Sequence, residues 1–510
     1  MRWSLGCFLA CLCGAFLPAQ KPSTATLDLY LSSAGKPTAA RVYITDSSGQ
    51  PHLIPSTVTY SRRGEDHSIV DQSAAVLLPP GPYTVRAEKG LEYRPAEKIV
   101  ALEAGEPIRL DLEIPRFYNM NQQGWYSGDL HIHRNPDELP LLVRAEDLNV
   151  APTITRHLGG QPRPLPDFPK SQFVPVDPAH IVSQHNQEVE RLGKGHGAVL
   201  LLNFSRPLSP DLTTLDPMEH EFCRQARAQG GFVDAEKPIW KNVPVNVAFG
   251  LIDAIGIVNN HFHPRDVLLE AEKYGSMERD DPSYNTPIGF ARWMMDLYYS
   301  FLNCGFRIPV SAGSASGVMP SWPGYERVYV HLGGVFSYDQ WFADLKAGRS
   351  MATNGPLLEV SIDGQVPGAQ FHWDGPTSVT LAIQARSQDP LDRVEILYNG
   401  AVIRAFPAGG NRVFLTAVNL TITEPGWLAV RCFEPAAKTV RYAHSSPFYF
   451  LLQGRLPVRR AAARKWADYM GRLARSVDPA EFPSPAAYQK AQAAWKEAEN
   501  IYRRLANENF

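Results

Sequence analysis

Residues 127–133 read Ser127-Gly128-Asp129-Leu130-His131-Ile132-His133. A strand that buries one face carries apolar side chains at alternate positions, but here Asp or His occupies every second position. Because residues i and i+2 of a strand project from the same face, His131 and His133 are expected to converge on one point. Two buried imidazoles side by side are stable when they share a cation or carboxylates, and metal ligation is the common arrangement. The alternative interpretation is a structural pair without a metal.

The surrounding segment, residues 117–355, alternates short apolar stretches with helical patterns. The apolar stretches cover residues 198–202, 231–233, 254–258 and 307–310, and the helical patterns include 180–192 and 290–303. Short, fully apolar strands between helices predict parallel β/α units. Ten of the 14 His residues lie in this segment, so we expect any chemistry here.

Further polar residues of this segment stand at or just after its apolar strands or in the loops between them: His157, Glu188, Glu190, His196, Glu236, His261 and His263. Taken singly, each is better explained as a surface or core polar group. In β/α barrels, however, functional side chains gather at the edge where the strands end, so their common placement favours one joint site. We also expect Asp129 or a backbone carbonyl to hold the second ring nitrogen of a ligand His and to fix its tautomer.

The flanking segments have different patterns. Residues 22–116 predict a β-sandwich, because apolar and charged residues alternate strictly over 108–114. Residues 356–450 predict a second β-sandwich, with a hairpin whose two-residue turn is Asn399-Gly400. Residues 456–510 predict a helical tail whose apolar stripe faces a core, formed by Tyr488, Ala491, Trp495, Ala498, Tyr502 and Leu505.

Composition sets the broad class. The chain has 510 residues, of which 44% are apolar and 20% charged, so global disorder is excluded and several domains are expected. Lys and Arg number 50 against 52 Asp and Glu, and this balance argues against nucleic acid as a partner. The 43 Pro and 38 Gly favour a turn-rich β protein or a loop-rich barrel over a helical bundle.

The first 19 residues have the pattern of an export signal. Arg2 precedes an apolar run over 5–17, and Leu17-Pro18-Ala19 resembles a cleavage site. We therefore expect a periplasmic or extracellular protein. A lipid-anchored form is the alternative because Cys7, Cys11 and Cys13 lie in this segment, although none follows a good lipobox.

The remainder of the chain shows no further membrane or disulfide signal. No other stretch reaches 18 apolar residues, so no stable membrane span is expected. Cys223, Cys304 and Cys432 are scattered, and we interpret them as buried small hydrophobic residues. Trp322 and Tyr325 belong to an aromatic-rich stretch that either packs internally or stacks on sugars.

The His131-Ile132-His133 motif with its preceding Gly-Asp-Leu resembles the first motif of PHP-type phosphoesterases. The wider layout is similar to metallohydrolases of the CehA/McbA type over about residues 24–450. This resemblance implies an α/β fold in which a PHP-like distorted β/α barrel, residues 117–355, lies between the two sandwiches. The second sandwich begins near Thr353-Asn354-Gly355-Pro356.

The resemblance also implies a ligand set. His131 and His133 match the paired His ligands, Glu188 the bridging Glu, and His196 the His of a later Gly-His element. His157 matches the His of an Asp-His element in which Arg156 replaces the Asp.

Two departures from the family pattern affect this set. A later His-Pro motif appears as Ala235-Glu236-Lys237-Pro238, so Glu236 is the expected ligand there. The late Asp-x-His motif appears as Ser314-Ala315-Ser316, which removes two ligands. The family site holds two or three ions, and here we expect one or two, with His261 as a compensating ligand.

The expected function is an exported metal-dependent hydrolase that cleaves a phosphoester, ester or amide bond in a small-molecule or envelope-derived substrate. A His/Glu ligand set suits a divalent transition metal, namely Zn²⁺, Mn²⁺ or Fe²⁺. Arg156 and Lys237 are the candidate catalytic groups that stabilise an anionic transition state, or they merely pair with Glu188 or Glu236. The alternative function is a non-catalytic binding protein on a degenerate PHP-like scaffold. The sequence specifies neither the substrate nor the oligomeric state.

Overall fold

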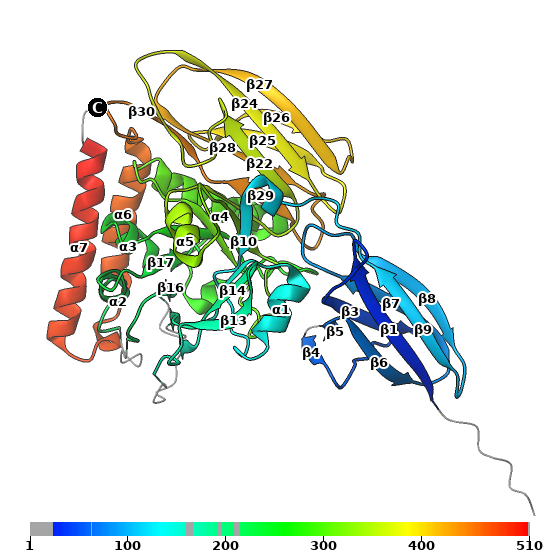
Figure 1. The fold of residues 1–510 in the computed structure, drawn as a ribbon. Coiled ribbons are helices and arrows are strands. Elements are labelled where there is room, and N and C mark those ends of the chain that lie inside the picture. Colours follow the sequence, from blue (N-terminus) through cyan, green and yellow to red (C-terminus); the bar gives the residue numbers. More distant parts are fainter. Residues whose placement is uncertain (1–23, 63, 160–166, 191–195, 209–214, 508–510) are drawn as a thin grey trace, which may run out of the picture.

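The computed structural model describes residues 24–507 except 63, 160–166, 191–195 and 209–214, so the expected export signal lies outside the described residues. Figure 1 shows the N-terminal strands as one body, a central mixed α/β region, a second strand-rich body and two C-terminal helices beside the central region. The α/β class and the helical tail are therefore confirmed. Among the described helices, none combines the length and the apolar character that a membrane crossing requires.

The N-terminal body is a sandwich of two sheets around one apolar core. One sheet has the order β2(Lys36–Pro37), β1(Ala25–Ser33), β6(Ser73–Leu78), with β9(Pro107–Glu113) parallel to β1. The other has the order β4(Val58–Arg62), β5(Glu65–Val70), β3(Ala40–Asp46), β7(Gly81–Glu88), β8(Ala96–Leu102). In β9, Leu110 and Leu112 are buried while Arg109 and Asp111 are exposed, which confirms the alternation read from the sequence.

The central region contains a six-stranded sheet. Its order is β12(Arg156–Gly159), β15(Gln187–Glu190), β16(Ala198–Leu202), β17(Phe232–Ala235), β18(Ala254–Asn259), β19(Val310–Gly313). The prediction of parallel strands holds for the pair β12–β15 and for β17–β18–β19, but β16 is antiparallel to both of its neighbours. The last strand begins at Val310 rather than at 307, and the carbonyl of Pro309 accepts a bond from the amide of Ile255.

A second, twelve-stranded sheet runs through the central region into the C-terminal sandwich. Its main path is β13(Phe173–Asp177), β14(His180–Ser183), β11(Val150–Pro152), β10(Trp125–Gly128), β20(Arg327–His331), β21(Ser350–Thr353), β29(Tyr442–Ser445), β28(Gly426–Phe433), β25(Arg393–Tyr398), β26(Ala401–Pro407). β30(Phe448–Leu451) also pairs with β28 and carries β23(Gln370–His372). A sheet of β22(Leu357–Ile362), β24(Thr377–Arg386) and β27(Val413–Ile422) completes the C-terminal sandwich.

Two strand pairs in the central region pass from one sheet to the other. The chain leaves β11 in the large sheet and enters β12 in the six-stranded sheet after three residues, and β14 and β15 are related in the same way. The described ladders form two adjoining sheets, and the distorted β/α barrel that the resemblance implies stays a prediction.

The helix predicted over 180–192 is wrong, because this stretch forms β14 and β15. β15 lies between β12 and β16, so its backbone bonds are made to both neighbours instead of along a helix. The helix predicted over 290–303 is confirmed as α4(Pro287–Leu302), which begins with Thr286 as its cap. The Asn399-Gly400 hairpin between β25 and β26 is also confirmed.

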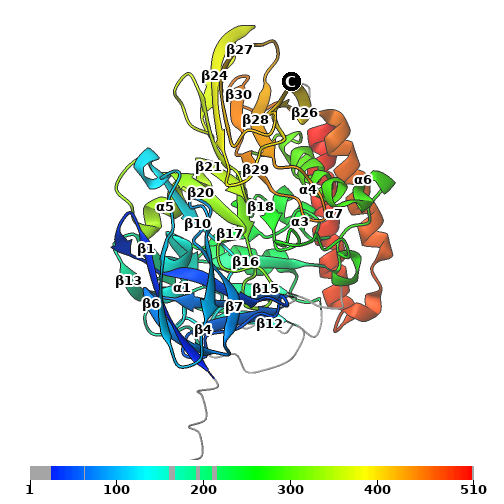
Figure 2. The same cartoon turned by 90° about the vertical axis from the view of Figure 1, so that its right-hand side faces the viewer.

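Helices cover the outside of the central sheets. They are α1(Leu139–Glu146), α2(Glu219–Arg227), α3(Val243–Ala248), α4, α5(Tyr338–Lys346), α6(Arg460–Ser476) and α7(Pro485–Asn507). Short 3₁₀ turns are η1(Asn121–Gln123), η2(Glu272–Tyr274), η3(Pro282–Asn285) and η4(Pro479–Glu481). α6 and α7 lie side by side along one flank (Figures 1 and 2). Four members of the predicted stripe of α7 are buried in the central core, namely Ala491, Trp495, Ala498 and Tyr502.

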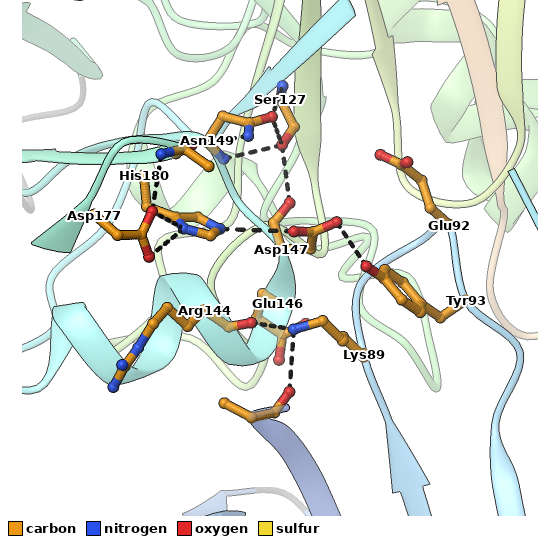
Figure 3. A network of polar contacts seen from close by, with 12 residues as sticks. Lys89, Glu92, Tyr93, Ser127, Arg144, Glu146, Asp147, Asn149, Asp177 and His180 are labelled. Atoms are coloured by element: carbon orange, nitrogen blue, oxygen red, sulfur yellow. Dashed lines mark hydrogen bonds and ion pairs between the residues drawn. The ribbon is translucent and has the colours of Figure 1, made fainter. Parts of the chain in front are cut away.

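The N-terminal sandwich is fixed to the central region through buried charges around α1. Arg41 of β3 is 2% exposed and pairs with Glu146 of α1 at 2.5 Å and with Glu88 at 2.8 Å. Lys89 donates to the backbone carbonyls of Ala39 and Arg144 (Figure 3). The pKa of Lys89 is lowered by burial, which the nearby carboxylates oppose.

Asp147, which ends α1 in the left-handed conformation at φ 48°, is the centre of this contact (Figure 3). Its carboxylate accepts from the hydroxyl of Tyr93 at 3.0 Å and lies 3.6 Å from Nε2 of His180. His180 in turn lies 2.8 Å from Asp177. The sandwich, α1 and β14 therefore meet in one polar network rather than through a flexible linker.

Replacing Arg41 by Met should destabilise the protein strongly. The variant keeps an apolar stem but leaves Glu146 and Glu88 without their buried cation, and breaking a buried pair in this way costs about 3 kcal/mol or more. Thermal unfolding should show a clearly lower Tm. Arg109→Met is the control, because Arg109 pairs with Asp111 on the surface, where such a pair contributes little. Equal Tm values for the two variants would contradict a structural role for this contact.

Candidate metal centre

The two His residues of the His-x-His motif come shortly after β10, which ends at Gly128. The peptide between them is held in an extended form, because Ile132 bridges in parallel to both Thr153 and Ser316. The amide of His133 donates to the carbonyl of Ser316 at 2.7 Å. The two imidazoles consequently lie on the same side, with ring centroids 4.9 Å apart and Nε2 atoms 2.9 Å apart. The predicted convergence of His131 and His133 is confirmed.

Glu188 of β15 brings a carboxylate to the same point. Its Oε2 lies 3.3 Å from Nε2 of His131 and 3.1 Å from Nε2 of His133. The same oxygen lies 3.3 Å from Nε2 of His157. Glu188 is 3% exposed, so one buried oxygen faces three imidazole nitrogens.

His157 and Glu190 extend the group toward solvent. β12 and β15 pair in parallel with His157 opposite Glu188, which places the two side chains together. Glu190 lies two residues further along β15 and reaches His157 Nε2 at 2.9 Å. The side chain of His157 is 34% exposed, so the open side of the site is here.

These five residues, which we call the metal group, have the geometry and chemistry of a site for divalent cations. The ligand atoms of His131, His133 and Glu188 lie within 4.8 Å of one another, and so do those of His157, Glu188 and Glu190. A tetrahedral ion with bonds of 2.0–2.2 Å separates its ligand atoms by about 3.4 Å. The observed separations of 2.9–3.3 Å need only small adjustments to fit. Glu188 belongs to both sets.

The electrostatics of the metal group favour positive charge at its centre. Burial lowers the pKa of His131, but the adjacent Glu188 and Glu236 carboxylates raise it to about 10. Burial is likewise opposed at His157, where Glu188 and Glu190 raise the pKa to about 8. Burial raises the pKa of Glu188, yet His131 and His157 hold it well below its usual range. The carboxylates thus require positive charge beside them. Either protonated imidazoles or a bound metal ion can supply it.

Glu236 was expected as a metal ligand, but its carboxylate lies behind His131 and not among the ligand atoms of the metal group. Its Oε2 lies 2.9 Å from Nδ1 of His131, on the opposite side of the ring from Glu188. Its Oε1 accepts from Nε1 of Trp240 at 2.8 Å and pairs with Lys237 at 2.7 Å. Glu236 therefore orients His131 from behind. Lys237 neutralises Glu236. Of the two roles expected for Lys237, transition-state stabilisation or pairing with a carboxylate, the structure shows the pairing.

Asp129 does not hold a ring nitrogen, contrary to the expectation. Its two oxygens accept from the amides of His131, Ser314 and Gly324 and from the hydroxyl of Ser314. Burial raises the pKa of this carboxyl group, and these hydrogen bonds oppose the shift. Asp129 fixes the backbone of the motif instead. Ser314 likewise contacts Asp129 through its amide and hydroxyl, and the backbone carbonyl of Ser316 accepts from the amide of His133.

Three of the expected site residues make their described contacts elsewhere. Arg156 donates to the carbonyl of Leu208, since neighbouring residues of a strand face opposite sides and His157 faces the metal group. His196 faces Asn242 at 3.3 Å and stacks near Trp495. His261 lies 2.6 Å from the carbonyl of Leu268. Glu190 was absent from the ligand set implied by the resemblance, but its alternation with Glu188 on one strand face was the available signal.

The comparisons with known proteins leave the chain without an assigned family. No family model matches it, and no curated protein matches it. One solved structure, of the minor pilin GBS52 from the Gram-positive pathogen Streptococcus agalactiae, matches at 19% identity and a TM-score of 0.16. The match covers 19% of this chain and 47% of the pilin chain, and at that TM-score it carries no argument.

Glu188→Gln should abolish metal binding, because it removes the charge that both ligand sets share. We expect stoichiometric transition metal in the purified wild-type protein and background levels in the variant, measured by inductively coupled plasma mass spectrometry. His185→Ala is the matched control, since His185 contacts the carbonyl of Pro169 and is not part of the metal group. Full metal content in Glu188→Gln would exclude this site.

Glu236→Gln should weaken metal binding without abolishing it. The group behind a ligand His tunes its basicity and orientation, and its loss typically lowers metal affinity by about 10–100-fold. Competition with a chromogenic chelator measures this affinity. An affinity equal to that of wild type would show that Glu236 does not support His131, and complete loss would show that Glu236 is itself a ligand.

Proposed function

We propose that this protein is a metal-dependent hydrolase that cleaves a phosphoester, ester or amide bond with one or two divalent transition metal ions. The observation that carries the proposal is the sharing of Glu188 between two groups of potential ligands. Nitrogen and carboxylate donors in this combination suit Zn²⁺, Mn²⁺ or Fe²⁺. When bound, such ions supply a water-derived nucleophile near neutral pH and polarise the oxygen of the scissile group.

The residues of the metal group would hold metal at two positions, one buried and one open to solvent. His131, His133 and Glu188 would hold an ion at the buried end, where little water competes. His157 and Glu190 would hold an ion at the open end, where a substrate enters. Glu236, neutralised by Lys237, would keep Nε2 of His131 directed at the ion through its ion pair with Nδ1.

The PHP-like barrel of the CehA/McbA type is part of the proposal. It is supported by the sequence motif and by the strands that cross between the two central sheets at 153–155 and 184–186, beside the ligand residues. Export to the periplasm or the extracellular space, with lipid anchoring as the alternative, is proposed from the pattern of residues 1–19. The substrate is proposed to be a small molecule or a fragment of the envelope.

A binding protein on a degenerate PHP-like scaffold is the second candidate. It is favoured by the late motif, in which Ser314 and Ser316 stand where the family has two ligands and instead contact Asp129 and the amide of His133. Such a protein would retain part of the ligand set and lack turnover.

Turnover by the metal-loaded protein tests the hydrolase. We expect hydrolysis of at least one of bis-p-nitrophenyl phosphate, p-nitrophenyl acetate and a p-nitroanilide. The absorbance of the released chromophore measures the rate. Glu188→Gln and chelation should both reduce the rate to that of buffer, while His185→Ala retains it. Bound metal without turnover of any of the three bond types favours the binding protein, and turnover that survives Glu188→Gln contradicts the proposed site.

A further inference from the structure

A cleft of about 240 Å³ lies where both sandwiches meet the central region. We call it the junction cleft. The N-terminal sandwich contributes Arg86 and Arg94, the central region Trp322 and Tyr325, and the C-terminal sandwich Arg412 and Arg441. Its lining includes no member of the metal group, so it is a separate feature of the fold.

Positive charge exceeds negative charge in the lining, with five arginines against the carboxylates Glu88, Asp389 and Glu434. Arg41 and Arg86 share Glu88 at 2.8 and 2.5 Å. Arg441 pairs with Asp389 at 2.9 Å. These pairs leave two lining arginines without a carboxylate among the described residues, one from each sandwich: Arg94 and Arg412.

Two buried donors in the same lining lie beside each other, the hydroxyl of Tyr325 and the guanidinium of Arg441. Burial raises the pKa of the Tyr325 hydroxyl, and the adjacent Arg441 opposes that shift. Neither this hydroxyl nor Nε of Arg441 makes a well-formed hydrogen bond within the described part of the chain. Tyr325 is 2% exposed, and its hydroxyl carries a proton that it can donate into the cleft.

The aromatic residues do not provide a sugar platform here. The guanidinium of Arg41 covers one face of Trp322 at 3.7 Å, and Tyr325 packs against its edge. Trp322 is 9% exposed. Of the two interpretations of these aromatics, internal packing is the one that the structure supports, and recognition in the cleft rests on its donors.

We propose that the junction cleft binds a small anion that carries a carboxylate or phosphate group. The arginine guanidinium offers a planar fork of donors that matches both groups, and the Tyr325 hydroxyl would donate a further bond. Ligand pockets typically measure about 300–1,000 Å³, so this cleft suits a ligand no larger than a sugar acid or a small phosphate ester.

Isothermal titration of the mature protein tests the proposal at constant ionic strength set by sodium chloride. The probes are inorganic phosphate, glucuronate and, as a neutral control, glucose. We expect saturable binding of phosphate, glucuronate or both, and none of glucose. Binding of phosphate alone identifies a phosphate ligand, and binding of glucuronate alone identifies a carboxylate ligand.

Variants locate the binding. Arg94→Gln/Arg412→Gln should weaken binding at least tenfold, and Tyr325→Phe should weaken it several-fold. Arg404→Gln is the matched control, because Arg404 is an exposed arginine of the same sandwich outside the lining. Circular dichroism and Tm confirm that each variant is folded.

Anion binding in the junction cleft does not depend on whether the protein is a hydrolase. Glu188→Gln should retain the anion affinity of wild type, whether or not the metal group works as proposed. Loss of binding in Glu188→Gln would place the anion at the metal group and overturn the proposal. The proposal would also be overturned if wild type shows no saturable binding of either anion. The same holds if Arg94→Gln/Arg412→Gln binds the anion as tightly as Arg404→Gln does.

Discussion

One carboxylate oxygen, Oε2 of Glu188, faces the Nε2 atoms of three imidazoles at 3.1–3.3 Å inside the central region. A buried carboxylate is tolerated only beside positive charge or hydrogen-bond donors. The position of β15 between β12 and β16 meets this constraint, because it sets Glu188 opposite His157 and holds both against the motif after β10. Register in these two ladders therefore determines whether the site exists.

The protein stabilises that register with buried polar contacts. Asp129 links the His-x-His backbone to Ser314 and Gly324, and the carbonyl of Ser316 receives the amide of His133. The segment that carries Ser314 thus acts as a brace for the motif. This brace holds the backbone that makes His131 and His133 converge.

Local patterns predicted what depends on local periodicity. The His131–His133 convergence, the helix α4 and the hairpin at Asn399-Gly400 follow from spacing, capping and turn chemistry, and all are present. The stretch 180–192 was misread because pairing with β12 and β16 decides its structure, and pairing is not a local property. Which ring nitrogen of His131 meets Glu188 and which meets Glu236 also depends on the assembled sheet.

Buried carboxylates are neutralised differently in the contact around α1 and in the metal group, and the difference bears on function. Around α1, Glu146 meets a permanent cation, Arg41. In the metal group, Nε2 of His131 lies 2.9 Å from Nε2 of His133, and the adjacent carboxylates raise the pKa of His131 to about 10, so without a metal ion a proton occupies this point. Two lone pairs and a carboxylate directed at one point are satisfied by a shared proton or by a metal ion.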